Sequence, residues 1–259
     1  MIEHVNGYIW TIDWQKRLRR ELPVLNQIIK QQKEKSTSKI LDIGCGPGYH
    51  FLELKKQHPK AECIGIDISE PMIQYAQSLA EKEQIQIDYR AGNFLEEPEI
   101  LRGEFDVIFS LGNSLSLIWA KSSPEHVLKT LIGHLHPEGS LFFQILNNDK
   151  PRKGYFASKI GMTLEGIEIF LLKRFEPNLP MKTMEVEFVT FQRKPEDTIY
   201  TYNASRSSWP LITSKELKEL LSKVGFHEIQ FWGNYACESY SPQNSESLLC
   251  WAKKKRIIV

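Results

Sequence analysis

Three alternate glycines, Gly44, Gly46 and Gly48, are the residues of this chain whose spacing points most directly to chemistry. They follow the apolar run 40–43 and precede an amphipathic segment that starts at Tyr49. Glycine accepts positive φ and lets a ligand approach the main chain, and the first turn of the following helix offers N–H groups without intrahelical partners. The pattern predicts a binding site for a nucleotide-type cofactor between a strand and a helix.

A carboxylate in the next apolar run supports this interpretation. Asp67 lies nineteen residues after Gly48, near the end of the run 63–68. At the tip of a strand it can accept hydrogen bonds from both hydroxyls of a ribose. The spacing Gly-x-Gly-x-Gly differs from the Gly-x-Gly-x-x-Gly spacing that holds a dinucleotide pyrophosphate, so a dinucleotide is the weaker interpretation. The alternative interpretation is that the glycines form a tight turn and Asp67 is a surface residue, neither of which binds a ligand.

The segments 41–48 (Leu-Asp-Ile-Gly-Cys-Gly-Pro-Gly) and 65–69 (Gly-Ile-Asp-Ile-Ser) together resemble the first two motifs of the class I S-adenosylmethionine-dependent methyltransferases. The resemblance implies S-adenosylmethionine as the cofactor. Segment 105–115 further resembles the fourth-strand motif of the glycine and sarcosine N-methyltransferases. In that subgroup an arginine of the N-terminal helix holds the methionyl carboxylate, and the resemblance assigns this role to Arg17.

One position departs from that subgroup. Its fifth strand ends in an arginine that binds the carboxylate of the amino-acid substrate, and Leu146 stands at that position here. Because a guanidinium fork is the natural partner of a small carboxylate, glycine and sarcosine are poor candidates unless an arginine such as Arg206 enters from another segment. We expect a less acidic or larger acceptor.

Short apolar strands alternate with helical segments from residue 39 onward, which predicts a parallel sheet with helices on both faces. We therefore expect an α/β fold with a doubly wound, seven-stranded, mostly parallel Rossmann-like sheet. In class I methyltransferases the last two strands form a hairpin whose seventh strand runs antiparallel within the sheet. The expected strands are 39–43, 62–67, 85–90, 105–110, 140–146, 226–233 and 246–253, and the expected helices are 48–57, 71–82, 124–135 and one from Thr213 to Gly225.

Two segments do not fit this alternation. Residues 1–38 carry apolar side chains at helical spacing and predict a helical cap over the cofactor site. Residues 150–208 are β-rich with polar turns, which predicts a small antiparallel lid that holds the substrate. The S-adenosylmethionine-binding α/β domain is then expected to comprise residues 39–149 and 209–259.

Further cofactor contacts can be assigned by position, because ligands of open α/β sheets lie across the carboxyl ends of the strands. Asn93 follows the third strand, where many methyltransferases have an aspartate that receives the adenine amino group. The apolar candidates have core packing as their alternative. Besides the glycines, Asp67 and Arg17, the expected contacts are Trp10, Asp42, Ile68, Met72, Asn93, Phe94 and Leu111.

Methyl transfer from a sulfonium is an in-line displacement, so alignment of the reacting groups and exclusion of water supply much of the acceleration. A neutral amine acceptor needs no base, whereas a hydroxyl acceptor usually does. Aromatic residues of the cap, Tyr8, Trp10 and Trp14, can face the cationic methyl group or simply pack the cap onto the sheet. We expect hydrogen-bonding side chains to position the acceptor: Tyr8, Asn113, Asn147 and Tyr202.

Composition narrows the classes of protein. With 33 basic and 32 acidic residues the formal net charge is +1, so no general field attracts nucleic acid, and no nucleic acid partner is expected. The absence of a bilayer-length apolar run, of a signal-like start and of close cysteine pairs predicts a cytoplasmic protein with reduced thiols, no metal and no membrane contact. The oligomeric state stays open.

We favour a methyltransferase acting on nitrogen or oxygen of a small molecule. The alternatives are an RNA or protein methyltransferase and a non-catalytic nucleotide-binding scaffold.

Overall fold

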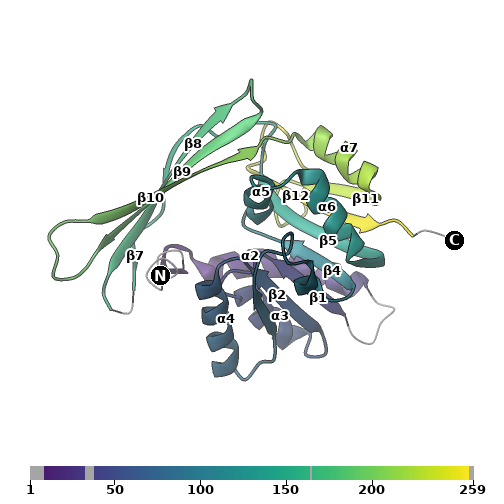
Figure 1. Cartoon of the computed structure of the whole chain (residues 1–259), viewed down its shortest axis with the longest axis horizontal. Helices are drawn as coiled ribbons and strands as arrows, with labels where there is room; N and C mark the ends of the chain where they lie inside the picture. Colours follow the sequence, from purple (N-terminus) through teal and green to yellow (C-terminus); the bar gives the residue numbers. More distant parts are fainter. Residues whose placement is uncertain (1–8, 33–37, 164, 257–259) are drawn as a thin grey trace.

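Two β-sheets organise this protein. The computed structural model describes residues 9–32, 38–163 and 165–256 of the chain. Within these residues, a seven-stranded sheet carries helices on both faces, and a five-stranded sheet extends away from it (Figure 1). The four cysteines carry free thiols. None of the helices in this part of the chain has the length and apolar character needed to cross a membrane.

The seven-stranded sheet has the spatial order β11-β12-β5-β4-β1-β2-β3. Strand β12 runs antiparallel to β5 and β11, and the other neighbours are parallel, which confirms the predicted fold class. From β1 the chain moves outward through β2 and β3, whereas β4 returns to the other side of β1, and such a switch point is where α/β sheets bind ligands. The strands are β1 (Lys39–Ile43), β2 (Glu62–Asp67), β3 (Asp88–Ala91), β4 (Phe105–Ser110), β5 (Leu135–Leu146), β11 (Phe226–Trp232) and β12 (Ser247–Lys254).

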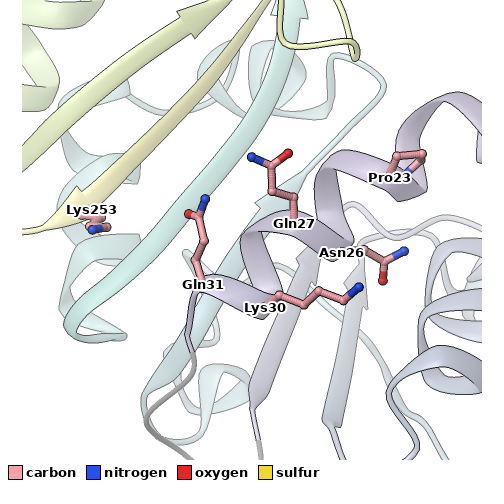
Figure 2. A pocket seen from close by; sticks show the side chains of 6 residues that line it. All are labelled: Pro23, Asn26, Gln27, Lys30, Gln31 and Lys253. Atoms are coloured by element: carbon pink, nitrogen blue, oxygen red, sulfur yellow. The ribbon is translucent and has the colours of Figure 1, made fainter.

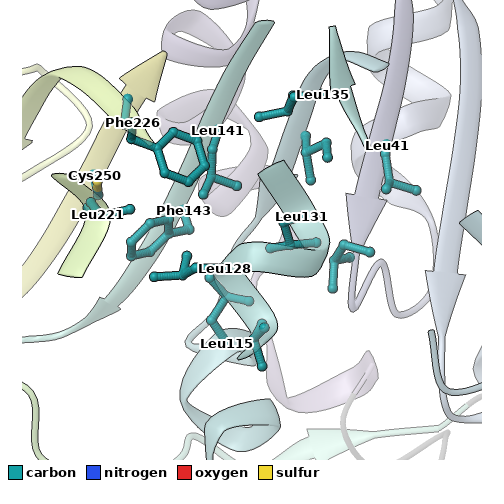
Figure 3. Close-up of a cluster of buried hydrophobic side chains, with 14 of the residues drawn as sticks. Leu41, Leu115, Leu128, Leu131, Leu135, Leu141, Phe143, Leu221, Phe226 and Cys250 are labelled. Atoms are coloured by element: carbon teal, nitrogen blue, oxygen red, sulfur yellow. The ribbon is translucent and has the colours of Figure 1, made fainter. Parts of the chain in front are cut away.

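Helices cover both faces of this sheet because its central strands are apolar on both sides. In β5, Phe142 packs on the face of α2, α3 and α4, and Phe143 packs on the face of α5, α6 and α7. Figure 3 shows the second cluster, where Leu128, Leu131 and Leu221 lie against the strands. The helices are α2 (Trp14–Gln31), α3 (Tyr49–Gln57), α4 (Glu70–Lys82), the 3₁₀ turn η1 (Pro98–Leu101), α5 (Ser114–Trp119), α6 (Pro124–Gly133) and α7 (Ser214–Val224).

The ends of these elements agree with the sequence in some places and differ in others. Helix α7 has the predicted capping box of Thr213 and Glu216 and ends at Gly225 in the left-handed conformation. The helix predicted for 124–135 stops two residues early, and β5 starts at Leu135 instead of residue 140. Strand β3 begins at Asp88 rather than residue 85. Helix α5 was not predicted, because its six residues are too few for a helical period to be recognised.

The second sheet begins where β5 ends. Its strands pair antiparallel, as the β-rich composition predicts, and its root packs on Leu146 and α5 through Phe175 and Trp209. From this root the sheet extends past the N-terminal end of α2 (Figure 1). Strand β6 was not predicted. The strands are β6 (Gly154–Ala157), β7 (Gly161–Met162), β8 (Glu168–Asn178), β9 (Thr183–Arg193) and β10 (Thr201–Pro210).

Candidate active site

The glycine loop joins β1 to α3 at the carboxyl edge of the seven-stranded sheet, and all three of its glycines have positive φ. A Cβ atom on Gly46 would meet nothing within 4 Å, so the main chain is open to a ligand there. A Cβ atom on Gly48 would lie 2.3 Å from the hydroxyl of Tyr89, which donates a hydrogen bond to the Gly48 carbonyl. Gly46 therefore offers ligand access, whereas Gly48 makes room for a buried side chain.

Asp67 lies at the tip of β2 with its carboxylate held by the main chain. One oxygen accepts the N–H of Gly46 and the other accepts the N–H of Ser69, both at 2.9 Å. Burial raises the pKa of Asp67, and these two hydrogen bonds act in the opposite direction. Since a carboxylate has about four acceptor sites, each oxygen can take a further donor. The group is thus pre-positioned to bind a pair of hydroxyls.

A cavity of about 200 Å³ opens beside Asp67. It brings together five predicted cofactor residues, Gly44, Asp67, Ile68, Asn93 and Phe94. Apolar walls with a few polar groups are typical of a small-molecule site. Helix α5 and the residue that follows its C-cap supply the side of the cavity that the sequence did not predict. This side consists of Ser114, Leu117 and Ile118 of α5 and of Lys121, which follows the helix.

Arg17 reaches the same edge of the sheet from α2. A Cβ atom on Gly112, just after β4, would lie 2.9 Å from the Arg17 guanidinium. The Nε of Arg17 donates to both carboxylate oxygens of Glu21, at 3.0 and 3.1 Å. Asp42 is buried nearby at the end of β1, where burial raises its pKa and the charge of Arg17 opposes that rise. A guanidinium and several carboxylates thus gather at the carboxyl ends of β1 and β4.

Glu21 is the centre of a buried polar network that the sequence did not reveal. Besides Arg17, its carboxylate contacts Arg20 at 3.0 Å and the Nε2 of His50 at 2.8 Å. Burial by itself would raise the pKa of Glu21, but the hydrogen bond from His50 and the charge of Arg17 lower it to about 2. Burial lowers the pKa of His50. The network ties α2, which carries Arg17, to α3, which follows the glycine loop.

Several predicted site residues are not brought to the cavity. Met72 and Leu111 do not line it, and Leu111 is buried in the core on the α2 face. The main chain of Trp10 packs against Gly161 of β7, where a Cβ atom would meet the Trp10 carbonyl. Tyr8 lies outside the described residues.

Three of the predicted acceptor-positioning residues, Asn113, Asn147 and Tyr202, lie in the described part of the chain, and each is hydrogen-bonded to other groups or turned away from the cavity. The side-chain oxygen of Asn113 accepts the N–H of Leu146 at 2.9 Å and so joins the tips of β4 and β5. The amide of Asn147 is buried and bonds to main-chain groups of two loops. Tyr202 is 72% exposed. Its register opposite Phe191 places it on the side of the second sheet that faces away from the body.

A separate open groove of about 780 Å³ lies along α2, near the start of β5. The residues that line it include Gln27, Gln31 and Lys253 (Figure 2). No predicted site residue contributes to it. The groove and the carboxyl ends of the parallel strands thus lie at different ends of the sheet. The predicted site residues gather at the carboxyl ends of the strands.

This fold and this site define a class of protein: a Rossmann-like α/β protein with a glycine loop at its switch point and a carboxylate at the tip of β2. The model of a family described as a methyltransferase domain matches residues 40–139. This match supports the predicted class I S-adenosylmethionine-dependent methyltransferase, a family whose cofactor is S-adenosylmethionine.

The relatives are similar over different spans. The ubiquinone biosynthesis O-methyltransferase of Coxiella burnetii is 30% identical over 142 residues, which are 54% of this chain and 56% of that protein. The chain thus spans about half the length of this relative. A putative methyltransferase of Geobacillus sp. (strain WCH70) is 24% identical over 93% of this chain and 97% of its own length. An S-adenosylmethionine-dependent methyltransferase from Clostridium acetobutylicum shares the fold, with a TM-score of 0.72 at 15% identity over 95% of this chain and 93% of its own.

Gly46 and Gly48 of the loop allow a matched prediction. Gly46→Ala should cost about 1–2 kcal/mol of stability, the usual cost of a left-handed conformation, and should weaken S-adenosylhomocysteine binding because its methyl group enters the open space. Gly48→Ala should cost about 2–5 kcal/mol, since a clash with Tyr89 adds to that strain. Urea unfolding and calorimetric titration measure both quantities. Equal stability losses, or a stronger binding defect in a folded Gly48→Ala variant, would contradict these assignments.

Proposed function

We propose that this protein transfers a methyl group from S-adenosylmethionine to a nitrogen or oxygen of a small molecule by in-line displacement. The observation that carries the proposal is the Asp67 carboxylate, held by two main-chain N–H groups and turned to a cavity that Asn93 and Phe94 also line. The Coxiella burnetii relative is named for O-methylation in ubiquinone biosynthesis, which supports a small-molecule acceptor.

The cofactor would lie across the tips of β2, β1 and β4. We assign the ribose hydroxyls to Asp67 and the adenine ring to the cavity formed by Ile68, Asn93, Phe94 and α5. Gly46 leaves room for the cofactor where it crosses the loop. The methionyl carboxylate then falls to Arg17, whose guanidinium lies over the main chain just after β4. The end of β5 and the root of the second sheet would border the place where the cofactor supplies its methyl group.

The chain's residues contribute mainly position and shielding. When bound, the cofactor supplies the electrophilic methyl group, and the acceptor must lie in line with the methyl–sulfur bond at near-attack distance. Asn113 joins the tips of β4 and β5 and so fixes the main chain that borders this point. The second sheet, rooted on Leu146 and α5, would limit the access of water to it.

Calorimetric titration of the protein with S-adenosylmethionine, S-adenosylhomocysteine and NAD tests the proposal. We expect micromolar binding of the first two and no binding of NAD, because the glycine spacing does not fit a pyrophosphate. Binding of NAD alone would point to a dehydrogenase. If none of the three ligands binds, the result would favour a non-catalytic scaffold. A panel of small amines and phenols, with S-adenosylhomocysteine release as the readout, then identifies the acceptor.

A further inference from the structure

The two faces of the second sheet differ in charge. On its outer face, which is turned away from the seven-stranded sheet, charged side chains of β8, β9 and β10 pair with one another. The inner face is the one on which Phe175 and Trp209 pack against Leu146. In an antiparallel sheet, directly opposite residues share a face, so the pairing register assigns every residue of these strands. The outer-face ion pairs are Arg193–Glu168, Arg206–Glu187 and Arg174–Glu176.

Lys173 is the only ionisable side chain that this register places on the inner face, among the described residues of β6, β8, β9 and β10. It stands between two aromatic rings of the same face, because Phe156 is opposite it on β6 and Phe188 is opposite it on β9. Its ammonium lies 5.6 Å from the ring centroid of Phe188. Lys173 is half-buried, and no carboxylate of the described residues forms an ion pair with it.

Two arginines approach Lys173 from other elements. Arg152, in the segment between β5 and β6, lies 5.7 Å from the ring centroid of Phe156 and donates to the Glu246 carbonyl. Arg17 approaches from α2. Burial lowers the pKa of Lys173, and the charges of Arg152 and Arg17 lower it further. A half-buried cation among cations is costly without a counter-charge, so an anion placed here would be stabilised.

We propose that the inner face of the second sheet binds an anionic group of the methyl acceptor, a carboxylate or a phosphate, with Lys173 and Arg152 as its ligands. That the bound molecule is a methyl acceptor rests on the proposed function. Phe156 and Phe188 provide apolar walls for the part of the molecule next to the anion. The site replaces the missing arginine at position 146, and the acceptor is therefore more acidic than the sequence suggested.

This assignment corrects the expectation for Arg206. The sequence left open that Arg206 enters the site and binds a carboxylate. In the structure the Arg206 side chain is 82% exposed and pairs with Glu187 at 3.0 Å on the outer face. Since neighbouring residues of a strand point to opposite faces, Arg206 cannot reach the inner face without a shift in register. The second sheet supplies a lysine instead.

A pair of amine-reactive probes tests the site without knowledge of the acceptor. Pyridoxal 5′-phosphate and pyridoxal both form imines with neutral lysines, and only the first carries a phosphate group. The full chain is treated with each probe at neutral pH, reduced with borohydride and mapped by mass spectrometry. Exposed Lys159, between β6 and β7, is the internal reference. The measured quantity is the ratio of labelling at Lys173 to labelling at Lys159. We expect this ratio to be about tenfold higher with pyridoxal 5′-phosphate than with pyridoxal, because one charge-assisted contact has about that effect.

Variants and competing anions sharpen the result. Arg152→Gln should reduce the preference for the phosphate probe, whereas the control Lys159→Met should leave the labelling of Lys173 unchanged. Protection by inorganic phosphate alone indicates a phosphate-bearing acceptor, and protection by benzoate alone indicates a carboxylate. Equal behaviour of Lys173 and Lys159 toward both probes, without protection by either anion, would overturn the proposal.

Two further measurements separate this inference from the proposed function. S-adenosylhomocysteine binding tests the cofactor site, and it should be retained in Lys173→Met. If the unmodified protein does not bind S-adenosylhomocysteine, the proposed function is wrong. The labelling result would then still test whether the second sheet binds an anion. Once an acceptor is known, Lys173→Met should raise its KM about tenfold while Lys173→Arg retains most of the affinity. An equal fall of kcat in both variants would make Lys173 a base and refute anion binding.

Discussion

Replacing Asp67 by alanine should weaken S-adenosylhomocysteine binding by about 10- to 150-fold, because a hydrogen bond to a charged group contributes about 1.5–3 kcal/mol. The carboxylate is held by the N–H groups of Gly46 and Ser69, so it is oriented before the ligand arrives. The variant loses both the proposed acceptor for the ribose hydroxyls and the bond that shapes the loop at Gly46. Calorimetric titration measures the change.

Two other variants separate these contributions. Asp67→Asn keeps one acceptor oxygen and should lose less affinity than Asp67→Ala. Glu70→Ala removes an exposed carboxylate from the first turn of α4, close to Asp67 in the sequence, and should leave the affinity unchanged. If a folded Asp67→Ala protein binds the ligand as the unmodified protein does, Asp67 does not bind the ribose.

Replacing Glu21 by glutamine should lower the free energy of unfolding at neutral pH by about 3–5 kcal/mol, the usual cost of removing one partner from a buried ion pair. Glu21 is 1% exposed and contacts Arg17, Arg20 and His50. The neutral amide removes the negative charge that Glu21 places beside Arg17. Because Arg17 is the proposed ligand of the methionyl carboxylate, affinity for S-adenosylhomocysteine should fall as well.

The loss should depend on pH in a defined direction. The pKa of Glu21 is about 2 in the folded protein, well below the ordinary value of 4.5 for a glutamate. Its ionisation therefore contributes about 3 kcal/mol of stability above pH 4.5, and this contribution is lost as the pH falls toward 2. Burial lowers the pKa of His50 in the folded state. Protonation of the unfolded chain below the ordinary histidine value of 6.5 therefore destabilises the unmodified protein and the variant alike.

Urea unfolding at several pH values measures this difference. The difference in the free energy of unfolding between the unmodified protein and Glu21→Gln should be largest near pH 7 and should become smaller below pH 4.5. Glu53→Gln breaks an exposed pair with Lys56 and should cost no more than about 1 kcal/mol at any pH. A difference in the free energy of unfolding that does not change with pH would show that Glu21 acts through packing alone.

Local pattern in the sequence was sufficient for the sheet and for bringing together the residues that we propose to bind adenosine. The glycine loop, Asp67 and Asn93 follow successive strands, and the carboxyl ends of parallel strands meet at one edge. The position of these residues in the chain therefore placed them near one another, and the structure lines one cavity with Gly44, Asp67 and Asn93. The same logic missed α5, whose six residues are shorter than the window in which a helical period can be seen.

Only the tertiary structure decided which side chains fill the remainder of the site. Glu21 and His50 come from α2 and α3, and their contact depends on how two helices cross over the sheet. Asn147 had a plausible position, but loop main-chain groups engage its amide.

Lys173 and Tyr202 show why such details escape a sequence. Both lie on β-rich segments that were predicted, yet the register places Lys173 on the inner face and Tyr202 on the outer one. A shift of one residue in that register would exchange the two faces. Composition and periodicity determine that a strand forms, because they act through neighbouring residues. The face that each side chain takes depends on pairing between distant strands, which only the folded chain determines.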